Sequence, residues 1–450
     1  MSRKLFGTDG IRGEANVAPM TPETALRVGM AVAAKFGRDG RIVVGKDTRL
    51  SGYLLESALA SGLCSVGADV LFVGPLPTPG IAYLTTSLRA SAGVVISASH
   101  NAFHDNGIKL FAGDGYKLPD AIEAEIEALM LGDELEAMRA TGDAIGRAER
   151  VDDAAGRYIT HLKYGFPSRY DLSGLKVVVD CAHGAAYRVA PAVLRELGAD
   201  VTTIGCEPDG LNINEGVGAM HPELIGAAVR EHGADIGLAL DGDADRLVLC
   251  DEEGTLLDGD VIMAMCARDL QQRGRLQGGA VVATVMSNLG LERSLEEVGV
   301  QLVRTPVGDR YVVAAMRAGG YNLGGEQSGH LVFTDMATTG DGMVAALQVL
   351  TIMRRTGSTV SQLSRVMTRL PQLMRSILVA RKEPIDKIPK LARAIEQAEK
   401  ELVGRGRVLV RYSGTEKKLR VMVEGDDESQ LQRILERLES VVLEEIGVRP

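Results

Sequence analysis

Short apolar runs alternate with longer amphipathic segments along most of the chain. Three β-branched runs end in polar residues and glycine, and after each a helix-like segment leads to a second apolar run. The first runs begin at Arg41, Leu175 and Gly279, and the second runs span 67–74, 198–205 and 299–308. Short apolar strands that alternate with helices predict βαβ units with a mainly parallel sheet. The repetition predicts three related mixed α/β domains in series.

The C-terminal part departs from this pattern. Residues 405–425 predict two strands around a Ser-Gly-Thr turn, and a helix with one apolar face is predicted to follow. The apolar positions of that face are Leu431, Ile434, Leu435, Leu438, Val441 and Val442. We therefore expect a smaller α+β domain at this end. The predicted domains are 1–155, 156–255, 256–368 and 369–450.

Composition is typical of a soluble globular protein. The 450 residues leave room for about three or four domains. The net charge of −10 argues against general binding to nucleic acid or to an anionic membrane. Five widely spaced cysteines without a CxxC pair indicate reduced thiols. With no apolar N-terminal segment and no apolar run of 18 residues, the sequence predicts a cytoplasmic protein without a membrane span.

A dense acidic segment follows one apolar run and precedes another. It reads Asp241-Gly242-Asp243-Ala244-Asp245-Arg246. Three carboxylates at alternate positions can converge on one Mg²⁺ ion, which prefers oxygen ligands. An acidic turn without a metal is the plain alternative. A calcium-binding EF-hand fits less well, because Arg246 stands where that loop needs glycine and the flanks predict strands.

A second polar segment, Val94–Asn101, carries Ser97, Ser99 and His100 directly after an apolar run. The glycines that flank the nucleophilic serine of an α/β-hydrolase are missing here. In extended chain, His100 would point to the opposite face from Ser99, so we expect no direct proton transfer between them. A serine paired with a metal site favours an oxygen that carries a phosphoryl group.

Three further stretches carry candidate chemistry. Lys109 follows a turn and fits either an acid/base group or an ordinary surface lysine. Residues 324–330 place Glu326, Ser328 and His330 at alternate positions of a glycine-rich loop, where they suit sugar hydroxyls. Residues 411–416 gather an arginine, hydroxyls and backbone N–H groups that can enclose a phosphate, although an ordinary hairpin turn would look similar.

Together these motifs resemble the α-D-phosphohexomutase superfamily over essentially the whole chain, and in its order. The matching segments are GTDGIRG (7–13), SASHN (97–101), DGDADR (241–246), GEQSGH (325–330) and RYSGTE (411–416). Gln327 and the segments 206–214 and 338–342 resemble the branch that acts on glucosamine phosphates. Two positions depart from the family's usual proline, namely Ala102 and Lys417, and both departures predict less rigid loops.

The resemblance implies four domains around a central cleft and a role for each motif. Ser99 matches the phosphoserine of the family. The family's metal ligands match Asp241, Asp243 and Asp245, with Ser99 as a further ligand. The positions that contact the reacting groups are Arg12, Lys109, Arg246 and His330, with Lys109 and His330 as the acid/base candidates. Glu326 and Ser328 match the contacts to sugar hydroxyls. The phosphate clamp matches Arg411, Ser413, Gly414, Thr415 and Arg420.

The implied reaction interconverts glucosamine 6-phosphate and glucosamine 1-phosphate through glucosamine 1,6-bisphosphate. It would use one Mg²⁺ per chain, with the bisphosphate or an equivalent as activating phosphate donor, and would feed UDP-N-acetylglucosamine and cell-wall synthesis. The implied partner is a small sugar phosphate; members of the family often form homodimers, but no segment here identifies an interface. Two alternatives stay open at this point: a relative that acts on mannose or glucose phosphates, and a sugar-phosphate binding protein without catalysis.

Overall fold

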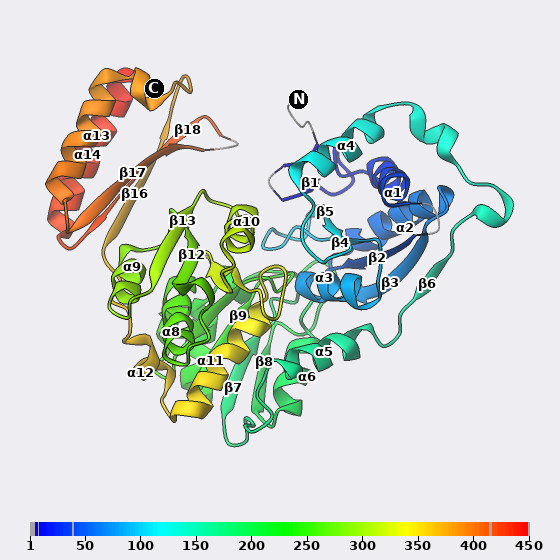
Figure 1. Ribbon diagram of the computed structural model, residues 1–450, viewed down its shortest axis with the longest axis horizontal. Coiled ribbons are helices and arrows are strands. Elements are labelled where there is room, and N and C mark those ends of the chain that lie inside the picture. The colour runs from blue at the N-terminus through cyan, green and yellow to red at the C-terminus, as the bar shows by residue number, and fades with distance from the viewer. Residues whose placement is uncertain (1–4, 8, 38–39, 414–415, 449–450) are drawn as a thin grey trace.

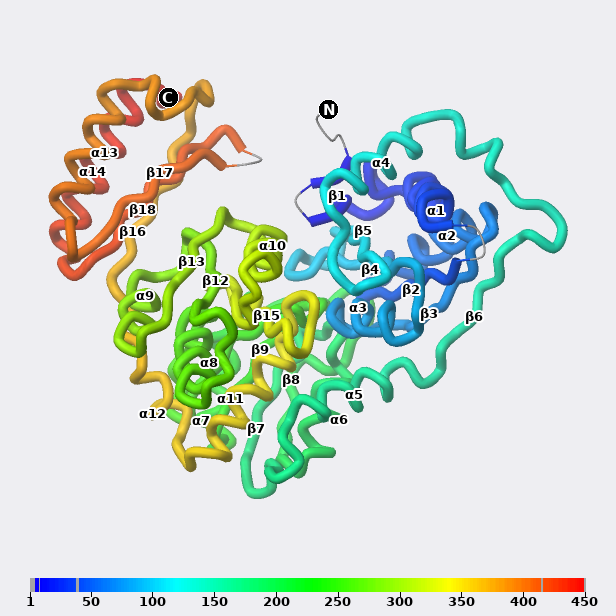
Figure 2. Tube along the Cα trace, in the orientation of Figure 1, coloured from blue at the N-terminus to red at the C-terminus, as the bar shows by residue number. Residues whose placement is uncertain are grey.

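The computed structural model describes residues 5–7, 9–37, 40–413 and 416–448. Three α/β domains follow one another along the chain, and a smaller C-terminal domain completes it, which confirms the predicted fold class. In Figure 1 the first domain lies at the upper right, the C-terminal domain at the upper left, and the second and third domains form the base. The tube in Figure 2 shows the C-terminal domain beside the third domain.

A six-stranded mixed sheet with the order β1-β5-β4-β2-β3-β6 forms the first domain. Its elements are β1 (Ile11–Glu14), α1 (Pro22–Phe36), β2 (Arg41–Lys46), α2 (Ser51–Ser65), β3 (Asp69–Pro75), α3 (Thr78–Ser87), β4 (Ala92–Ile96), β5 (Asp105–Ala112), α4 (Asp120–Leu131) and β6 (Ala148–Arg150). Ile42 and Val44 pack with α1, α2 and α4, whereas Val43 packs on the side of α3. This alternation is what a strand buried on both faces requires.

The second domain contains a five-stranded sheet with the order β11-β10-β9-β7-β8. Its elements are α5 (Ala154–Tyr164), β7 (Lys176–Asp180), α6 (Val189–Glu196), β8 (Asp200–Ile204), α7 (Glu223–His232), β9 (Ile236–Leu240), β10 (Leu247–Cys250) and β11 (Leu256–Leu257). Strands β9 and β10 are antiparallel neighbours joined by the acidic segment 241–246. As predicted, strands flank this segment on both sides, which excludes the helix–loop–helix geometry of an EF-hand.

The third domain contains a four-stranded sheet with the order β13-β12-β14-β15. Its elements are α8 (Gly259–Gln272), β12 (Ala280–Thr284), α9 (Leu289–Glu296), β13 (Gln301–Thr305), α10 (Asp309–Gly319), β14 (Leu323–Gly325), β15 (Leu331–Phe333), α11 (Gly342–Thr356) and α12 (Val360–Ser364). The parallel pairs β2–β3, β7–β8 and β12–β13 confirm the three predicted strand–helix–strand repeats.

The C-terminal domain has its own apolar core. Its elements are β16 (Gln372–Leu378), α13 (Pro389–Leu402), β17 (Gly406–Tyr412), β18 (Lys418–Gly425) and α14 (Glu428–Glu445). One apolar cluster runs through the first three domains, whereas a separate cluster lies between the C-terminal sheet and its two helices. Polar contacts, such as Arg293 Nη1 to Asp426 Oδ1 at 2.7 Å, join this domain to the third. A separate core is the arrangement that a hinged domain needs.

None of the helices in the described part of the chain is long and apolar enough to cross a lipid bilayer.

Candidate active site

Ser99 lies in a buried loop that follows β4, and a polar scaffold fixes this loop. Ser97 Oγ donates to Asp47 Oδ2 at 2.6 Å, and Ser99 N donates to Ser97 Oγ at 3.0 Å. Arg49 Nη2 and Asn214 Nδ2 each donate to the Ser99 carbonyl at 2.9 Å. Ser99 itself has a φ of 52°, in the left-handed region that a non-glycine residue seldom adopts. Such strain is typical of functional loops that their surroundings hold in place.

The expectation that His100 points away from Ser99 is wrong. His100 Nδ1 lies 3.3 Å from Ser99 Oγ. The expectation holds only for extended backbone, and the left-handed conformation of Ser99 turns the next side chain back toward the hydroxyl. Burial, with a further contribution from Arg246 and Arg12, lowers the pKa of His100 to about 4. The imidazole of His100 is therefore neutral. It makes a longer contact with the Ser99 hydroxyl, whose short hydrogen bond goes to Asp241.

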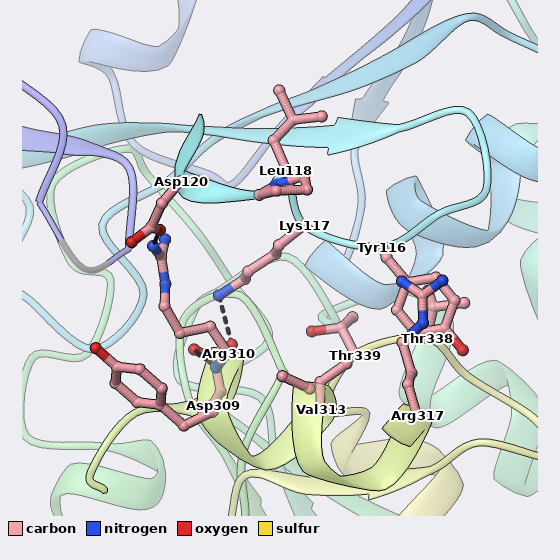
Figure 3. A pocket seen from close by; sticks show the side chains of 13 residues that line it. Tyr116, Lys117, Leu118, Asp120, Asp309, Arg310, Val313, Arg317, Thr338 and Thr339 are labelled. Atoms are coloured by element: carbon pink, nitrogen blue, oxygen red, sulfur yellow. Dashed lines mark hydrogen bonds and ion pairs between the residues drawn. The ribbon is translucent and has the colours of Figure 1, made fainter. Parts of the chain in front are cut away.

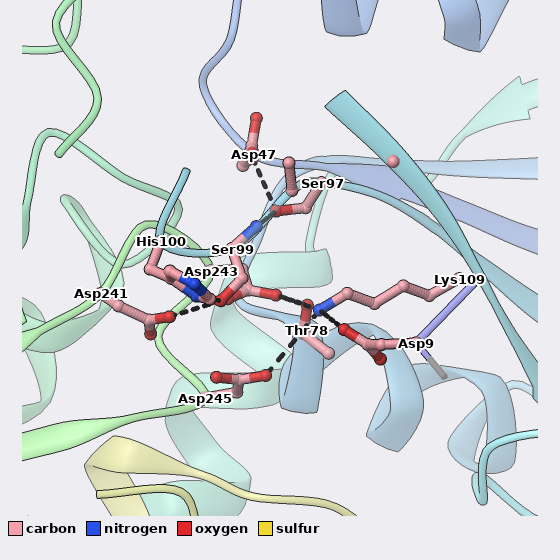
Figure 4. A network of polar contacts seen from close by, with 12 residues as sticks. Asp9, Asp47, Thr78, Ser97, Ser99, His100, Lys109, Asp241, Asp243 and Asp245 are labelled. Atoms are coloured by element: carbon pink, nitrogen blue, oxygen red, sulfur yellow. Dashed lines mark hydrogen bonds and ion pairs between the residues drawn. The ribbon is translucent and has the colours of Figure 1, made fainter. Parts of the chain in front are cut away.

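The Ser99 hydroxyl meets the acidic loop of the second domain. Ser99 Oγ donates to Asp241 Oδ2 at 2.6 Å, although the two residues are 142 positions apart. Asp241, Asp243 and Asp245, which we call the aspartate cluster, are all buried, and each offers a carboxylate oxygen within 4.8 Å of the others. Figure 4 shows these side chains converging with Ser99 and Lys109 on one point between the two domains.

Gly242 allows the two loops to approach. A Cβ atom at this position would lie 2.6 Å from the carbonyl oxygen of Ser99 and 2.8 Å from Asn214 Nδ2. Both distances are inside the contact limit of roughly 3.5 Å, so a side chain would push the serine loop away. The glycine in the acidic motif thus sets how near Ser99 lies to the aspartate cluster.

The aspartate cluster concentrates negative charge in a buried place. Burial, followed by the neighbouring Asp245 and Asp243, raises the pKa of Asp241 to about 8. Burial would also raise the pKa of Asp245, but the charges of His330, Lys109 and Arg246 hold it well below its ordinary value. A bound cation would offset the repulsion between these carboxylates.

Lys109 enters the cluster from β5. Its Nζ donates to Asp243 Oδ2 at 2.8 Å and lies 3.5 Å from Asp9 Oδ2. Burial would lower the pKa of this lysine, but Asp243, Asp9 and Asp245 raise it, so Lys109 is protonated. A protonated amine at this place can donate a proton or stabilise a negatively charged oxygen.

His330 and Arg246 complete the wall on the side of the third domain. His330 Nδ1 lies 3.5 Å from Asp245 Oδ1, and the backbones of Arg246 and His330 pair in an isolated bridge. Burial would lower the pKa of His330, but Asp245 and Asp309 raise it to about 9. A cavity of about 450 Å³ opens here, and its lining residues come from all three α/β domains, among them Arg12, Ser99, Asp245, Asp309 and His330.

The aspartate cluster fits a divalent cation. Asp243 Oδ1 and Asp245 Oδ1 are buried oxygens without a hydrogen-bond partner in the described structure. Carboxylate oxygens in this number and spacing are the ligands that Mg²⁺ takes in proteins. The donor set therefore matches the metal that the sequence predicts.

A second cavity, of about 510 Å³, adjoins the first and shares Arg246 and Glu326 with it. Ser328 and Gln327 also line it, so the two predicted sugar contacts face one space. Glu326 Oε1 accepts from Gly308 N at 3.1 Å, which fixes the carboxylate at the boundary of the two cavities.

The predicted phosphate clamp lies in the C-terminal domain. The structure describes three of its members, Arg411, Ser413 and Arg420, and none of the three lines either cavity. Gly414 and Thr415 fall outside the described residues. Arg411 and Arg420 are direct cross-strand partners on β17 and β18, where like charges repel and an anion would offset the repulsion. Arg411 Nη2 reaches Met286 Sδ at 3.7 Å, and Met286 lines the second cavity.

Sequence reasoning missed several polar residues of the site. Thr78, at the start of α3, donates to Asp243 Oδ2 at 2.7 Å. Asp9 contacts Arg12, Lys109 and Lys117, and its place within the quoted GTDGIRG segment was a usable signal. Lys117 lies between β5 and α4, Asp309 is the first residue of α10, and no motif in the sequence marks either of them.

Family models for the four domains of phosphoglucomutase/phosphomannomutase match almost the whole chain. The α/β/α domains I, II and III match residues 3–136, 156–254 and 258–370, and the C-terminal domain matches 373–441. The chain therefore belongs to the phosphoglucomutase/phosphomannomutase family, also called the α-D-phosphohexomutases.

Within this family, highly similar relatives carry one name. The phosphoglucosamine mutase of Syntrophotalea carbinolica is 56% identical over 453 residues, covering 100% of this chain and 99% of the relative. That of Geobacter metallireducens is 56% identical over 448 residues, covering 99% of each chain. Among solved structures, a phosphoglucomutase/phosphomannomutase family protein of Burkholderia thailandensis superposes with a TM-score of 0.82 at 25% identity, covering 100% of both chains. An N-acetylphosphoglucosamine mutase of Aspergillus fumigatus, solved with GlcNAc-6P and magnesium, has a TM-score of 0.67 at 18% identity over 99% of this chain and 96% of its own, and shares the fold.

Proposed function

We propose that the chain is a phosphoglucosamine mutase, which interconverts glucosamine 6-phosphate and glucosamine 1-phosphate. The observation that supports this best is the Ser99 hydroxyl, 2.6 Å from Asp241 and within a cluster of three carboxylates and a protonated lysine. Its relatives at 56% identity over the full chain carry this name, and the substrate assignment depends on them.

In the proposed reaction, phospho-Ser99 is the donor. The O1 hydroxyl of glucosamine 6-phosphate attacks the phosphorus, and the bond from phosphorus to Ser99 Oγ breaks. An acid/base group of the site gives a proton to the leaving Ser99 Oγ, and the proton of O1 replaces it. The product of this step is glucosamine 1,6-bisphosphate. After the sugar turns over, Ser99 Oγ attacks the phosphorus at position 6 and the bond from that phosphorus to O6 breaks. The serine proton passes to O6 through an acid/base group of the site, and glucosamine 1-phosphate leaves. Glucosamine 1,6-bisphosphate or an equivalent donor would load Ser99 initially.

The residues of the site divide the work. Asp241, Asp243 and Asp245, with a phosphoserine oxygen, would hold one Mg²⁺, whose charge offsets that of the transferring phosphoryl group. Lys109 and His330 are our acid/base candidates, since both lie beside the aspartate cluster. Arg12 and Arg246 line the cavity and supply further positive charge there.

The sugar itself must bind in two orientations. Glu326 and Ser328 would accept its hydroxyls in both, because they face one space that adjoins the cavity of Ser99. Arg411, Ser413 and Arg420, with Gly414 and Thr415, would hold the phosphate that does not react. The separate core of the C-terminal domain supports closure of this clamp over the substrate, which would also exclude water.

The test compares turnover of glucosamine, glucose and mannose 6-phosphates by the wild type and by Ser99→Ala, with Mg²⁺ and a hexose bisphosphate present. We expect preference for the amino sugar in the wild type and no turnover by Ser99→Ala. Preference for glucose or mannose 6-phosphate would assign the chain to another branch of its family. Binding of all three without turnover would leave a sugar-phosphate binding protein.

A further inference from the structure

Six ionisable side chains beside the active site form a closed ring in which basic and acidic groups alternate. We call it the charge ring, and its members in order are Lys109, Asp9, Lys117, Asp309, His330 and Asp245. The first domain contributes Asp9, Lys109 and Lys117, the second contributes Asp245, and the third contributes Asp309 and His330. The ring therefore joins the three α/β domains at the active site.

Lys117 is the link between the first and the third domain. Its Nζ donates to Asp309 Oδ2 at 2.6 Å and also pairs with Asp9 Oδ1. Figure 3 shows the lysine reaching down from the first domain to Asp309 at the start of α10. The side chains of Lys117 and Asp309 are each only 13% exposed, so water screens this pair weakly.

Each of these two residues lies one contact behind an acid/base candidate. Asp309 Oδ2 is 3.6 Å from His330 Nε2, on the side of the imidazole opposite to Asp245. Lys117 holds Asp9, and Asp9 Oδ2 is 3.5 Å from Lys109 Nζ. The Lys117–Asp309 pair thus sets the separation between the supports of Lys109 and of His330.

The pair also forms a wall. Lys117 and Asp309 line the 450 Å³ cavity of Ser99 on one side and a cavity of about 290 Å³ on the other, which lies between the first and third domains. Leu118, Val313 and Tyr311 are among the apolar residues of that second cavity. An apolar contact would suffice to close such an interface, because a buried ion pair gains little stability over well-packed apolar side chains. The charged pair between Lys117 and Asp309 is therefore better explained by the positions in which it holds neighbouring side chains than by stability.

We propose that Lys117 and Asp309 are positioning residues of the phosphoryl-transfer reaction, which hold Lys109 and His330 at a fixed separation across the domain boundary. This inference rests on the proposed function. In this role each residue acts through its neighbour in the charge ring. A displacement of about 1 Å in such a group can lower the rate roughly a hundredfold, so the effect should appear in kcat.

The test uses the full-length protein with Mg²⁺ and compares Lys117→Met, Asp309→Asn, the double variant and Lys117→Arg. We expect kcat to fall about a hundredfold in either single variant while KM for glucosamine 6-phosphate changes less than about threefold. The double variant should be no slower than the singles, because both act on one link. Lys117→Arg keeps the charge and should recover most of kcat.

The matched control is Arg310→Gln. Arg310 pairs with Asp120 and Glu123 across the same domain boundary but is not part of the charge ring. We expect wild-type kcat in this variant. Equal kcat in the wild type, Lys117→Met and Asp309→Asn would overturn the inference, as would strictly multiplicative losses in the double variant. If kcat falls in proportion to the melting temperature in all variants, including Arg310→Gln, the pair has a structural role and the inference is also overturned. An inactive wild type would instead refute the proposed function.

Discussion

Replacing Gly242 by alanine adds one methyl group at the contact between the serine loop and the acidic loop. That methyl would lie 2.6 Å from the Ser99 carbonyl oxygen. Ordinary contact needs roughly 3.5 Å, so one loop must move by about 1 Å. Gly242 does not have a positive φ, so alanine can adopt the same backbone conformation and the expected effect is steric.

The magnitude follows from this displacement. A shift of about 1 Å between phosphoryl donor and its stabilising groups is expected to lower kcat roughly a hundredfold. Overpacking should also lower the free energy of unfolding by about 1–3 kcal/mol. Both loops are packed on well-buried strands, so the methyl has no free direction in which to relax.

The assay measures kcat for glucosamine 6-phosphate below the melting temperature of every variant. Gly156→Ala is the control, because a Cβ at Gly156, in α5, meets nothing within 4 Å. It should keep wild-type kcat and gain up to about 1 kcal/mol of stability. Wild-type kcat in a folded Gly242→Ala variant would refute the argument that the contact of the two loops sets the rate.

Three further predictions follow from other parts of the structure. Removal of divalent metal with EDTA should lower turnover by at least about a hundredfold, and Mg²⁺ should restore it; full activity without bound metal, measured by elemental analysis, would contradict the role of the aspartate cluster. Tyr158→Phe removes the 2.7 Å hydrogen bond from Tyr158 Oη to the buried Asp341 and should lower the free energy of unfolding by about 1–3 kcal/mol, measured by denaturant titration. Burial, and then the charge of Asp258, raises the pKa of Asp260 from 3.8 to about 7. The native state therefore holds this proton more tightly than the unfolded state, and the stability it contributes is present below pH 4 and is lost as the pH rises to about 7. Asp260→Asn should flatten this part of the stability profile, whereas parallel profiles would show that Asp260 does not titrate there.

The sequence predicts the strands and the fold class well, for a physical reason. Runs such as 41–46 and 176–180 are β-branched, buried on both faces and bounded by polar residues, so one pattern encodes both the strand and its place in the sheet. The loops that carry the chemistry are recognisable in the sequence because each gathers unusual residue types within a few positions.

The contacts between loops could not be predicted in the same way. The proximity of Ser99 to His100 depends on one left-handed residue, which no local pattern marks. Lys117 and Asp309 meet only because the first and third domains pack together, and neither belongs to a recognisable motif. Positions of this kind depend on long-range packing, so they appear only in the folded chain.

The central claim is that Ser99 carries the phosphoryl group that reaches the sugar. The most direct measurement loads Ser99 with an ¹⁸O-labelled phosphoryl group and follows the enzyme through a single turnover with unlabelled glucosamine 6-phosphate, using mass spectrometry of the peptide that contains Ser99 and of the sugar phosphates. We predict that the label leaves Ser99 and appears in glucosamine 1,6-bisphosphate at the rate of the reaction, while unlabelled phosphate from the substrate replaces it on Ser99. Label that remains on Ser99 while product forms, or that lies on another residue, would contradict the account.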